Sequence, residues 1–137
     1  SSSSSSGGGG GENLSVGRTL HNLGVIYCDR REHDVAMDCF EQSLRIRKSV
    51  LGKRHPSVAD CMCWIGRVHR ERGSYRSALE CFLSALCARE DALGPNHPDV
   101  AEALRNVGVV HDDLGEHEES LRCYKRCLHI RRTALGG

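Results

Sequence analysis

The 137 residues are enough for one domain, and 19 basic against 18 acidic side chains leave a formal charge of only +1. This balance gives no general electrostatic reason to bind nucleic acid or an anionic membrane surface. No apolar run approaches the roughly 20 residues that cross a bilayer. The bulk properties therefore favour a protein whose partners are neither nucleic acids nor membranes.

Residues 1–13 begin with six serines followed by five glycines. Such a segment buries no apolar surface and loses its full conformational entropy on ordering, so we predict a disordered linker. No strand is expected before the glycines and no Gly-Lys-Ser or Gly-Lys-Thr follows them, which excludes a phosphate-binding loop. We expect this segment to carry no chemistry.

The rest of the chain repeats itself every 42 residues. The pattern Leu-Gly-x-x-His-Pro-x-Val-Ala starts at Leu51 and again 42 residues later at Leu93, and a third Leu-Gly begins at Leu135. A fixed period of this size indicates a stacked array of one supersecondary unit. We place one domain over 14–137, with units at about 14–52, 53–94 and 95–137. Other identical columns are Val16/Val58/Val100, Gly24/Gly66/Gly108, Cys39/Cys81/Cys123, Leu44/Leu86/Leu128 and Arg47/Arg89/Arg131.

Each unit contains two stripes of apolar residues at helical spacing. In the first unit they predict a helix near 14–29, a turn at 30–33, and a second helix that Asp34 caps and that runs to about Val50 before Gly52. The other units repeat this hairpin, so we expect six helices in three antiparallel pairs. The side chains expected to pack inside are Val16, Leu20, Leu23, Tyr27, Ala36, Cys39, Phe40, Ser43, Leu44 and Ile46 in the first unit, Val58, Met62, Ile65, His69, Ala78, Phe82, Ala85 and Leu86 in the second, and Val100, Leu104, Val107, His111, Leu121, Tyr124 and Leu128 in the third.

The turns inside the hairpins differ in one residue. Gly73 and Gly115 suit a left-handed turn conformation in the second and third units, because glycine has no side chain to clash. The first unit has Arg31 in the same column, where a side chain costs on the order of 1 kcal/mol. We therefore expect a slightly different turn in the first hairpin.

The period alone leaves the class of repeat open, because HEAT, armadillo and propeller units are of similar length. Helical stripes exclude a propeller. Gly24, then Ala36, then a ring at Phe40 give an order of small and large residues that resembles the tetratricopeptide repeat. The columns that carry this resemblance are Leu20/Leu23/Gly24/Tyr27/Ala36/Phe40/Ser43, Met62/Ile65/Gly66/His69/Ala78/Phe82/Ala85 and Leu104/Val107/Gly108/His111/Ser120/Tyr124/Cys127.

The resemblance implies an all-α, right-handed superhelix of three helix-turn-helix hairpins. The usual unit has about 34 residues, and the roughly eight extra residues hold the Leu-Gly-x-x-His-Pro linker, which is similar to the kinesin-light-chain variety of the repeat. His69 and His111 depart from the family's usual Tyr, and Arg31 departs at the turn. The family implies a protein–protein interaction scaffold.

In the family that this chain resembles, the first helices line a concave groove that holds an extended peptide. Asn22 and Asn106 match an asparagine whose amide bonds the peptide backbone. Trp64 suits an aromatic anchor, and the groove arginines suit an acidic ligand. The groove residues that the resemblance implies are Arg18, His21, Asn22, Val25, Cys28, Cys63, Trp64, Arg67, Arg70, Glu102, Arg105, Asn106, Val109 and Asp112.

A structural interpretation of the same residues stays open. Trp64 is as well suited to packing as to ligand contact, and acidic residues such as Glu71 and Asp113 are placed to neutralise the groove arginines. A carboxylate clamp of the kind found in chaperone-tail-binding relatives is not expected, because it needs Lys and Asn where this chain has His21 and Val25.

Eight cysteines follow the helical period rather than a disulfide framework, so we expect reduced thiols and a cytoplasmic protein. Cys39, Cys81 and Cys123 lie about one repeat apart, too far for a shared metal ion.

His55 and His97 precede prolines, and we interpret them as hydrogen-bonded helix-start residues. Because no nucleophile, base or carboxylate pair is indicated, we predict no enzyme, no metal and no cofactor.

Two hypotheses of different class follow. The first is a scaffold that binds an extended, acidic segment of another protein in its groove. The second is an architectural spacer, supported by the third Leu-Gly at Leu135 and by the lack of a polar capping helix. It predicts a fragment of a longer array, or ends that stack on neighbouring repeats or on a second copy. Nucleic-acid binding through Arg67, Arg70 and Arg105 is disfavoured by the balanced charge.

Overall fold

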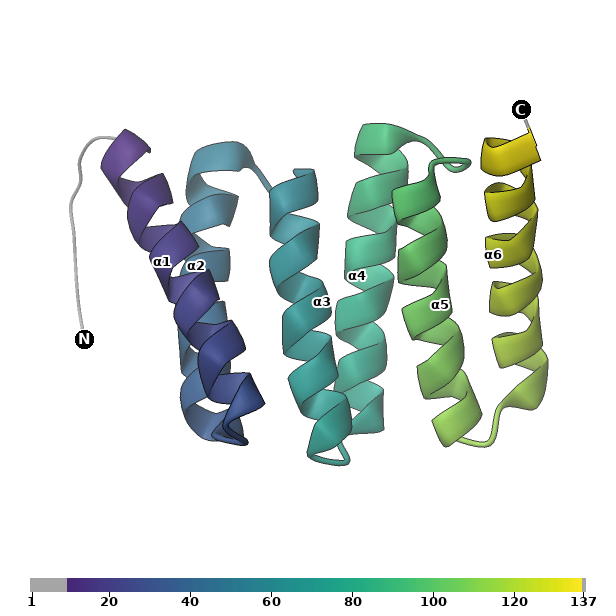
Figure 1. The fold of residues 1–137 in the computed structure, drawn as a ribbon, viewed down its shortest axis with the longest axis horizontal. Helices are drawn as coiled ribbons and strands as arrows, with labels where there is room; N and C mark the ends of the chain where they lie inside the picture. The colour runs from purple at the N-terminus through teal and green to yellow at the C-terminus, as the bar shows by residue number, and fades with distance from the viewer. Residues whose placement is uncertain (1–9, 137) are drawn as a thin grey trace.

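A computed structural model describes the backbone of residues 10–136 and the side chains of residues 14–135. Figure 1 shows the helices in sequence order along one row, from α1 at one end to α6 at the other. Within the described residues there is no strand, and the predicted all-α array of three helix-turn-helix hairpins is confirmed. The helices are α1 (Gly10–Asp29), α2 (His33–Leu51), α3 (Pro56–Glu71), α4 (Tyr75–Leu93), α5 (Pro98–Asp113) and α6 (His117–Gly136).

Helix boundaries agree with the sequence pattern to within a few residues. α2 begins two residues before the predicted start and ends one residue after the predicted end, and Glu32, not Asp34, occupies its N-cap position. α1 begins at Gly10, four residues before the predicted start near residue 14. The predicted linker thus overlaps the helix over residues 10–13, and its residues 1–9 lie outside the described part of the chain.

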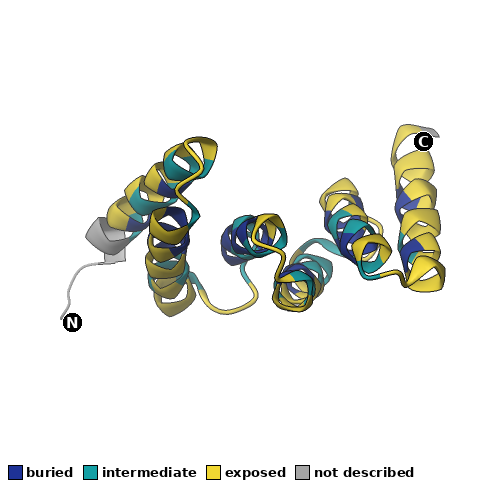
Figure 2. Ribbon diagram, turned by 90° about the horizontal axis from the view of Figure 1, so that it is seen from below, coloured by how far each residue is buried: buried dark blue, intermediate teal, exposed yellow. Residues whose placement is uncertain are grey.

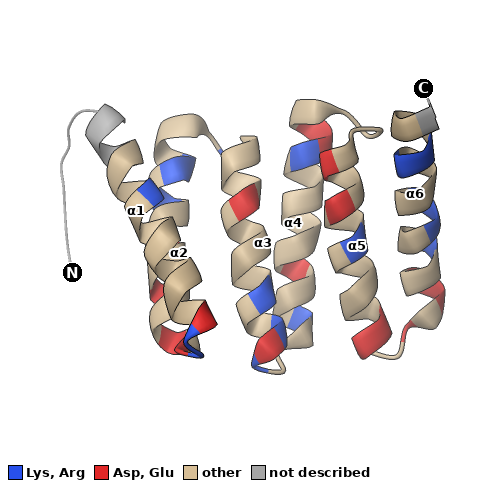
Figure 3. Cartoon of the chain, in the orientation of Figure 1, with Lys and Arg blue, Asp and Glu red and all other residues tan. Residues whose placement is uncertain are grey.

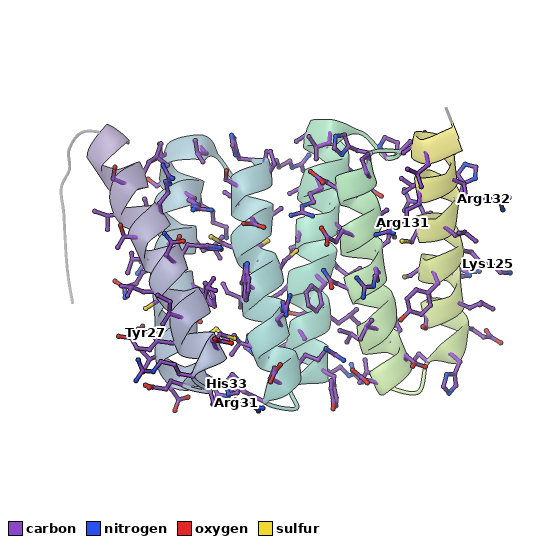
Figure 4. The ribbon with its side chains drawn as sticks, viewed as in Figure 1. Tyr27, Arg31, His33, Lys125, Arg131 and Arg132 are labelled. Carbon is purple, nitrogen blue, oxygen red and sulfur yellow. The ribbon has the colours of Figure 1, made fainter. Side chains whose placement is uncertain are left out.

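The three hairpin turns have the same backbone conformation. Arg31 has a φ of 69°, Gly73 one of 87° and Gly115 one of 84°. The same hydrogen bond closes each first helix. The amide after the turn residue donates to a carbonyl five residues back, as from Glu32 N to Tyr27 O at 2.8 Å. The expectation of a different first turn is therefore wrong. Tertiary packing keeps the hairpin geometry, and Arg31 adopts the left-handed conformation (Figure 4).

Replacing Arg31 by glycine is expected to stabilise the protein by about 1 kcal/mol, because the left-handed conformation is costly for any residue with a Cβ. The free energy of unfolding from urea denaturation, followed by circular dichroism, measures this change. Gly73→Ala is the reverse control and should destabilise by a similar amount, since nothing lies within 4 Å of a Cβ built at Gly73. If Arg31→Gly and the unchanged protein are equally stable, the left-handed conformation does not cost free energy at Arg31, which contradicts this prediction.

The linkers between hairpins are built alike. The ring Nδ1 of His55 accepts a hydrogen bond from the amide of Ser57 at 3.1 Å, and His97 accepts one from Asp99 at 3.0 Å. Each histidine caps a helix whose first residue is proline, a residue that needs no hydrogen-bond acceptor there. The interpretation of both histidines as helix-start residues is confirmed.

The core is distributed along the array, as expected for stacked units. Phe40 and Phe82 are almost completely buried, and each ring lies against a glycine of the preceding helix. A Cβ built at Gly24 would be 2.6 Å from Cε1 of Phe40, and one at Gly66 would be 2.9 Å from Cε1 of Phe82. The glycine column therefore allows the two helices of a hairpin to approach closely.

The two ends of the array do not follow the predicted burial. Val16 and Leu23 on α1, and Leu121, Tyr124 and Leu128 on α6, were expected to pack inside but are each more than a third exposed. The physical reason is position: in the inner repeats these columns contact the adjoining unit, and the described chain has none beyond α1 or α6. Figure 2 shows the resulting exposed surface over most of α6.

Candidate functional site

Two hollows lie along the face formed by the first helix of each unit. The larger, of about 600 Å³, lies between α1 and α3, and the smaller, of about 270 Å³, lies between α3 and α5. Both include Arg67 and Glu71, so together they form one groove, which we name the inner groove. Its lining residues are Val25, Ile26, Cys28, Asp29, Arg30, Arg31, Trp64, Arg67 and Glu71 in the larger hollow, and Arg67, Arg70, Glu71, Phe82, Arg105, Asn106 and Val109 in the smaller.

Trp64 packs against the core and also lines the larger hollow of the inner groove. Its ring stacks on Phe40, with centroids 5.6 Å apart and planes inclined by 23°, and meets the edge of the His21 ring at 6.0 Å. Its outer face is covered by the Arg67 guanidinium at 4.8 Å from the ring centre, a cation–π contact. Packing thus holds the indole rigidly in the groove wall, and the arginine lies between it and solvent.

His21 packs in the interior rather than projecting into the groove. Its side chain is only 13% exposed, and its ring lies 5.4 Å from that of Phe40. Nδ1 is 3.7 Å from Sγ of Cys61, and Nε2 is 3.7 Å from a carboxylate oxygen of Asp60. Sequence reasoning missed this Cys-His-Asp arrangement because its members come from α1 and α3.

That arrangement is not suited to nucleophilic catalysis. Burial raises the pKa of the Cys61 thiol, although hydrogen bonding to Ser43 opposes the shift. Burial also lowers the pKa of His21, although Asp60 opposes it. A nucleophilic cysteine needs a stabilised thiolate in a partly exposed position, whereas Cys61 is completely buried. Burial thus favours the neutral forms of Cys61 and His21, and both side chains serve as packing and hydrogen-bonding groups.

The arginines of the inner groove differ in their partners. Nε of Arg70 lies 2.7 Å from a carboxylate oxygen of Asp113 on α5. Arg30, which also lines the groove, lies 3.7 Å from a carboxylate oxygen of Glu32, whereas Arg67 and Arg105 form no ion pair among the described residues. Of the arginines that the sequence placed in the groove, the expected neutralisation by acidic residues is therefore confirmed for Arg70 only. Figure 3 shows that charges of both signs are dispersed over the array.

Eight residues of the predicted set line the inner groove: Val25, Cys28, Trp64, Arg67, Arg70, Arg105, Asn106 and Val109. Arg18 and Asn22 are exposed on α1 but line neither hollow. Cys63 was wrongly predicted as a groove residue, since it is 8% exposed in the core cluster around Phe82. Burial raises the pKa of its thiol to about 11.

Of the acids in the groove, the sequence analysis missed Asp29 and expected Glu71 and Asp113 only as neutralising partners of the arginines. Asp29 and Glu71 line the groove, and Asp113 joins them by pairing with Arg70. These three acids occupy one column at the end of α1, α3 and α5, so an acidic residue in every unit was the available signal. Within residues 14–135, no three His, Cys, Asp or Glu side chains are grouped so as to hold a metal ion. None of the helices that the structure describes is both long and apolar enough to cross a membrane.

Comparison with known proteins gives matches to one family. A family model described as a tetratricopeptide repeat matches residues 15–91 and 62–133. Among solved structures, BtubC (BKLC) from P. vanneervenii is similar at 22% identity with a TM-score of 0.83, covering 89% of this chain and 49% of that chain. No curated protein matches the chain.

Two further structures share the fold. A protein described as a kinesin light chain of Podosopora anserina with nearly identical TPR-like repeats has 19% identity and a TM-score of 0.75, covering 85% of this chain and 56% of that chain. The N-terminal domain of stress-induced protein-1 from C. elegans has 12% identity and a TM-score of 0.72, covering 88% of this chain and 87% of that chain. The present chain spans about half the length of the first two structures.

Proposed function

Because this chain belongs to the tetratricopeptide repeat family, of kinesin-light-chain-like type, we propose that it is a protein-interaction scaffold whose inner groove binds an extended peptide segment of a partner. Proteins of this family are in general non-enzymatic interaction scaffolds. The observation that carries the proposal is the continuity of the two hollows across α1, α3 and α5 at Arg67 and Glu71.

The groove walls have the chemistry that peptide recognition needs. Trp64 is an aromatic side chain already held between Phe40 and Arg67, so little conformational entropy of the indole is lost when a ligand contacts this pair. Asn106 lines the smaller hollow, and its amide both donates and accepts hydrogen bonds, as a peptide main chain requires. The groove can therefore hold a main chain without reading every side chain.

Charge favours an acidic ligand over the smaller hollow. Its lining includes three arginines, Arg67, Arg70 and Arg105, and one acid, Glu71. Arg70 already pairs with Asp113, which leaves Arg67 and Arg105 to meet carboxylates of the ligand. The proposed partner is thus an extended segment with acidic side chains that face α3 and α5.

The test uses three pools of fluorescently labelled random peptides, biased to acidic, neutral or basic composition, and fluorescence anisotropy as the readout. The acidic pool should bind best. The double substitution Arg67→Glu/Arg105→Glu should weaken its binding by about 30-fold or more, as loss of a binding hot spot does. Trp64→Phe should weaken it less, because a smaller ring keeps the contact with Phe40.

Arg76→Glu is the matched control, because it makes an arginine-to-glutamate change on α4, outside the groove. Its column already holds Asp34 and Glu118, so an acid is tolerated there. Absence of binding by all three pools, or equal loss with Arg76→Glu and with the groove variants, would contradict the proposal.

A second candidate function is architectural, as a spacer within an array of repeats. It is favoured by one observation, the apolar side chains exposed on both α1 and α6 at the ends of the row. The groove variants leave the apolar side chains at both ends of the array unchanged. They should therefore lose peptide binding but keep a spacer function, which separates the two candidate functions.

A further inference from the structure

Two apolar faces at the ends of the array have no partner among residues 14–135. We name Val16, Leu23 and Ile26 on α1 the N-face, and Leu121, Tyr124 and Leu128 on α6 the C-face. We propose that the C-face of one copy binds the N-face of a second copy, head to tail, and so continues the array between molecules. This inference does not depend on peptide binding in the groove.

The N-face consists of side chains that the inner repeats bury. Val16, Leu23 and Ile26 are 51%, 37% and 52% exposed, whereas the corresponding Val58, Ile65 and Val68 on α3 are at most 5% exposed, and Val100, Val107 and Val110 on α5 at most 1%. In those units, Ile65 and Val68 pack with Phe40 of the preceding unit, and Val107 and Val110 pack with Phe82. The N-face therefore has the composition of a surface that receives a preceding unit.

The C-face supplies the other half of the same contact. Leu121, Tyr124 and Leu128 occupy the columns of Leu79, Phe82 and Leu86, which belong to or pack against core clusters that include residues of α5. Tyr124 is 37% exposed whereas Phe82 is 1% exposed. Stacking a second copy on α6 would repeat the contact between α4 and α5, with Ile26 of the second copy in the place of Val110.

Charged residues at the rim point to the same occupant. Between the first and second units, Arg72 pairs with Asp34 at 3.2 Å and His33 with Glu71 at 3.6 Å. At the proposed junction the corresponding residues are Glu118 with Arg30 of the second copy, and His117 with Asp29 of the second copy. Both pairs again join a base to an acid, which favours this alignment of the two copies.

Other charges at the junction are less favourable. The pair His21 and Asp60 corresponds there to Arg105 with Arg18 of the second copy. The pair Arg70 and Asp113 corresponds to Asp112 with Asp29 of the second copy, but Asp112 also holds His117 at 3.0 Å. Arg132 lies on the outer side of α6 (Figure 4) and corresponds to Glu90. At the junction it would meet the neutral Gln42 of the second copy. The repulsion between Arg105 and Arg18 provides a way to test the geometry.

A head-to-tail contact between two different faces leaves one N-face and one C-face free in every assembly, so growth is open unless a ring closes. The first measurement is sedimentation of the full chain from about 1 µM to about 1 mM. The mean mass should rise beyond that of a dimer. A chain that stays monomeric over this range would overturn the proposal.

Two blocked variants identify the faces. Leu128→Glu should block the C-face and Ile26→Glu the N-face, each raising the dissociation constant for self-association by tenfold or more because a charge replaces a buried side chain. Each variant alone should be monomeric, yet an equimolar mixture should form a dimer through the intact face of each. Dimers of Ile26→Glu alone would indicate contact between two C-faces and overturn the head-to-tail alignment.

Two further variants test the alignment in detail. Arg18→Glu should tighten self-association by about threefold or more, because it converts the repulsion with Arg105 into an ion pair at the junction. Leu83→Glu is the control: Leu83 is 43% exposed, but its column holds Glu41 and Lys125, and its replacement should leave association unchanged. Loss of association with Leu83→Glu, or weaker association with Arg18→Glu, would contradict the proposed junction.

Discussion

Replacing Phe82 by alanine is expected to lower the free energy of unfolding by about 3–5 kcal/mol, as truncation of a buried aromatic ring does. The ring is 1% exposed and fills the space between Gly66 on α3 and the apolar side chains of α5. The glycine has no side chain that could move into the cavity. Urea denaturation, followed by circular dichroism at low protein concentration, measures the loss.

Tyr124→Ala is the matched control, because Tyr124 occupies the same column at the end of the array. Its ring is 37% exposed, so we expect a loss of about 1–2 kcal/mol, less than half that at Phe82. If Phe82→Ala does not fold, Phe82→Leu should be compared with Tyr124→Leu and should show the larger loss. Equal losses at the two positions would show that a covering neighbour does not determine the contribution of the ring.

Replacing Gly24 by alanine is expected to destabilise the protein by about 1–2 kcal/mol, because overpacking costs more than the helix propensity of alanine returns. The new Cβ would lie 2.6 Å from Cε1 of Phe40. That ring cannot move freely, since it is completely buried and stacked on Trp64. Thermal and urea denaturation together measure the change.

Gly17→Ala, on the same helix, is expected to have the opposite sign. A Cβ at Gly17 would be 3.4 Å from Ile46 Cγ2, and the other units already hold buried alanines, Ala59 and Ala101, in this column. Alanine should therefore stabilise by about 0.5–1 kcal/mol. A destabilising Gly17→Ala or a stabilising Gly24→Ala would contradict the packing described for α1.

The period of 42 residues predicted the fold because each repeated position meets the same local requirements. His55 and His97 cap the starts of α3 and α5. Gly52 and Gly94 end the preceding helices, α2 and α4, with φ angles of 103° and 105°. These are local interactions within a few residues, and a single sequence is enough to predict them. Arg31 marks the limit of this reasoning, because its local cost is outweighed by the packing of the hairpin that it closes.

The candidate site was predicted less completely. A position on a first helix indicates which side chains are near the groove but not which way each ring turns. Trp64 was expected either to pack or to bind. Its contact with Phe40 shows that it packs, and binding stays a prediction that its place in the groove lining allows. His21 and Cys63 were expected in the groove, but Phe40 and Phe82 from the second helices hold them in the interior. These contacts join residues far apart in sequence.

The sequence by itself determined the class of fold, the length of the unit, the histidine caps of α3 and α5 and the glycine turns, because these depend on neighbouring residues and on the repeat. Only the tertiary structure decided which members of a column are buried. Val58 and Val16 are the same residue in the same register, yet one is 0% and the other 51% exposed. Burial depends on the unit that stacks against a side chain, and the residues of that unit are not the neighbours of the side chain in the sequence.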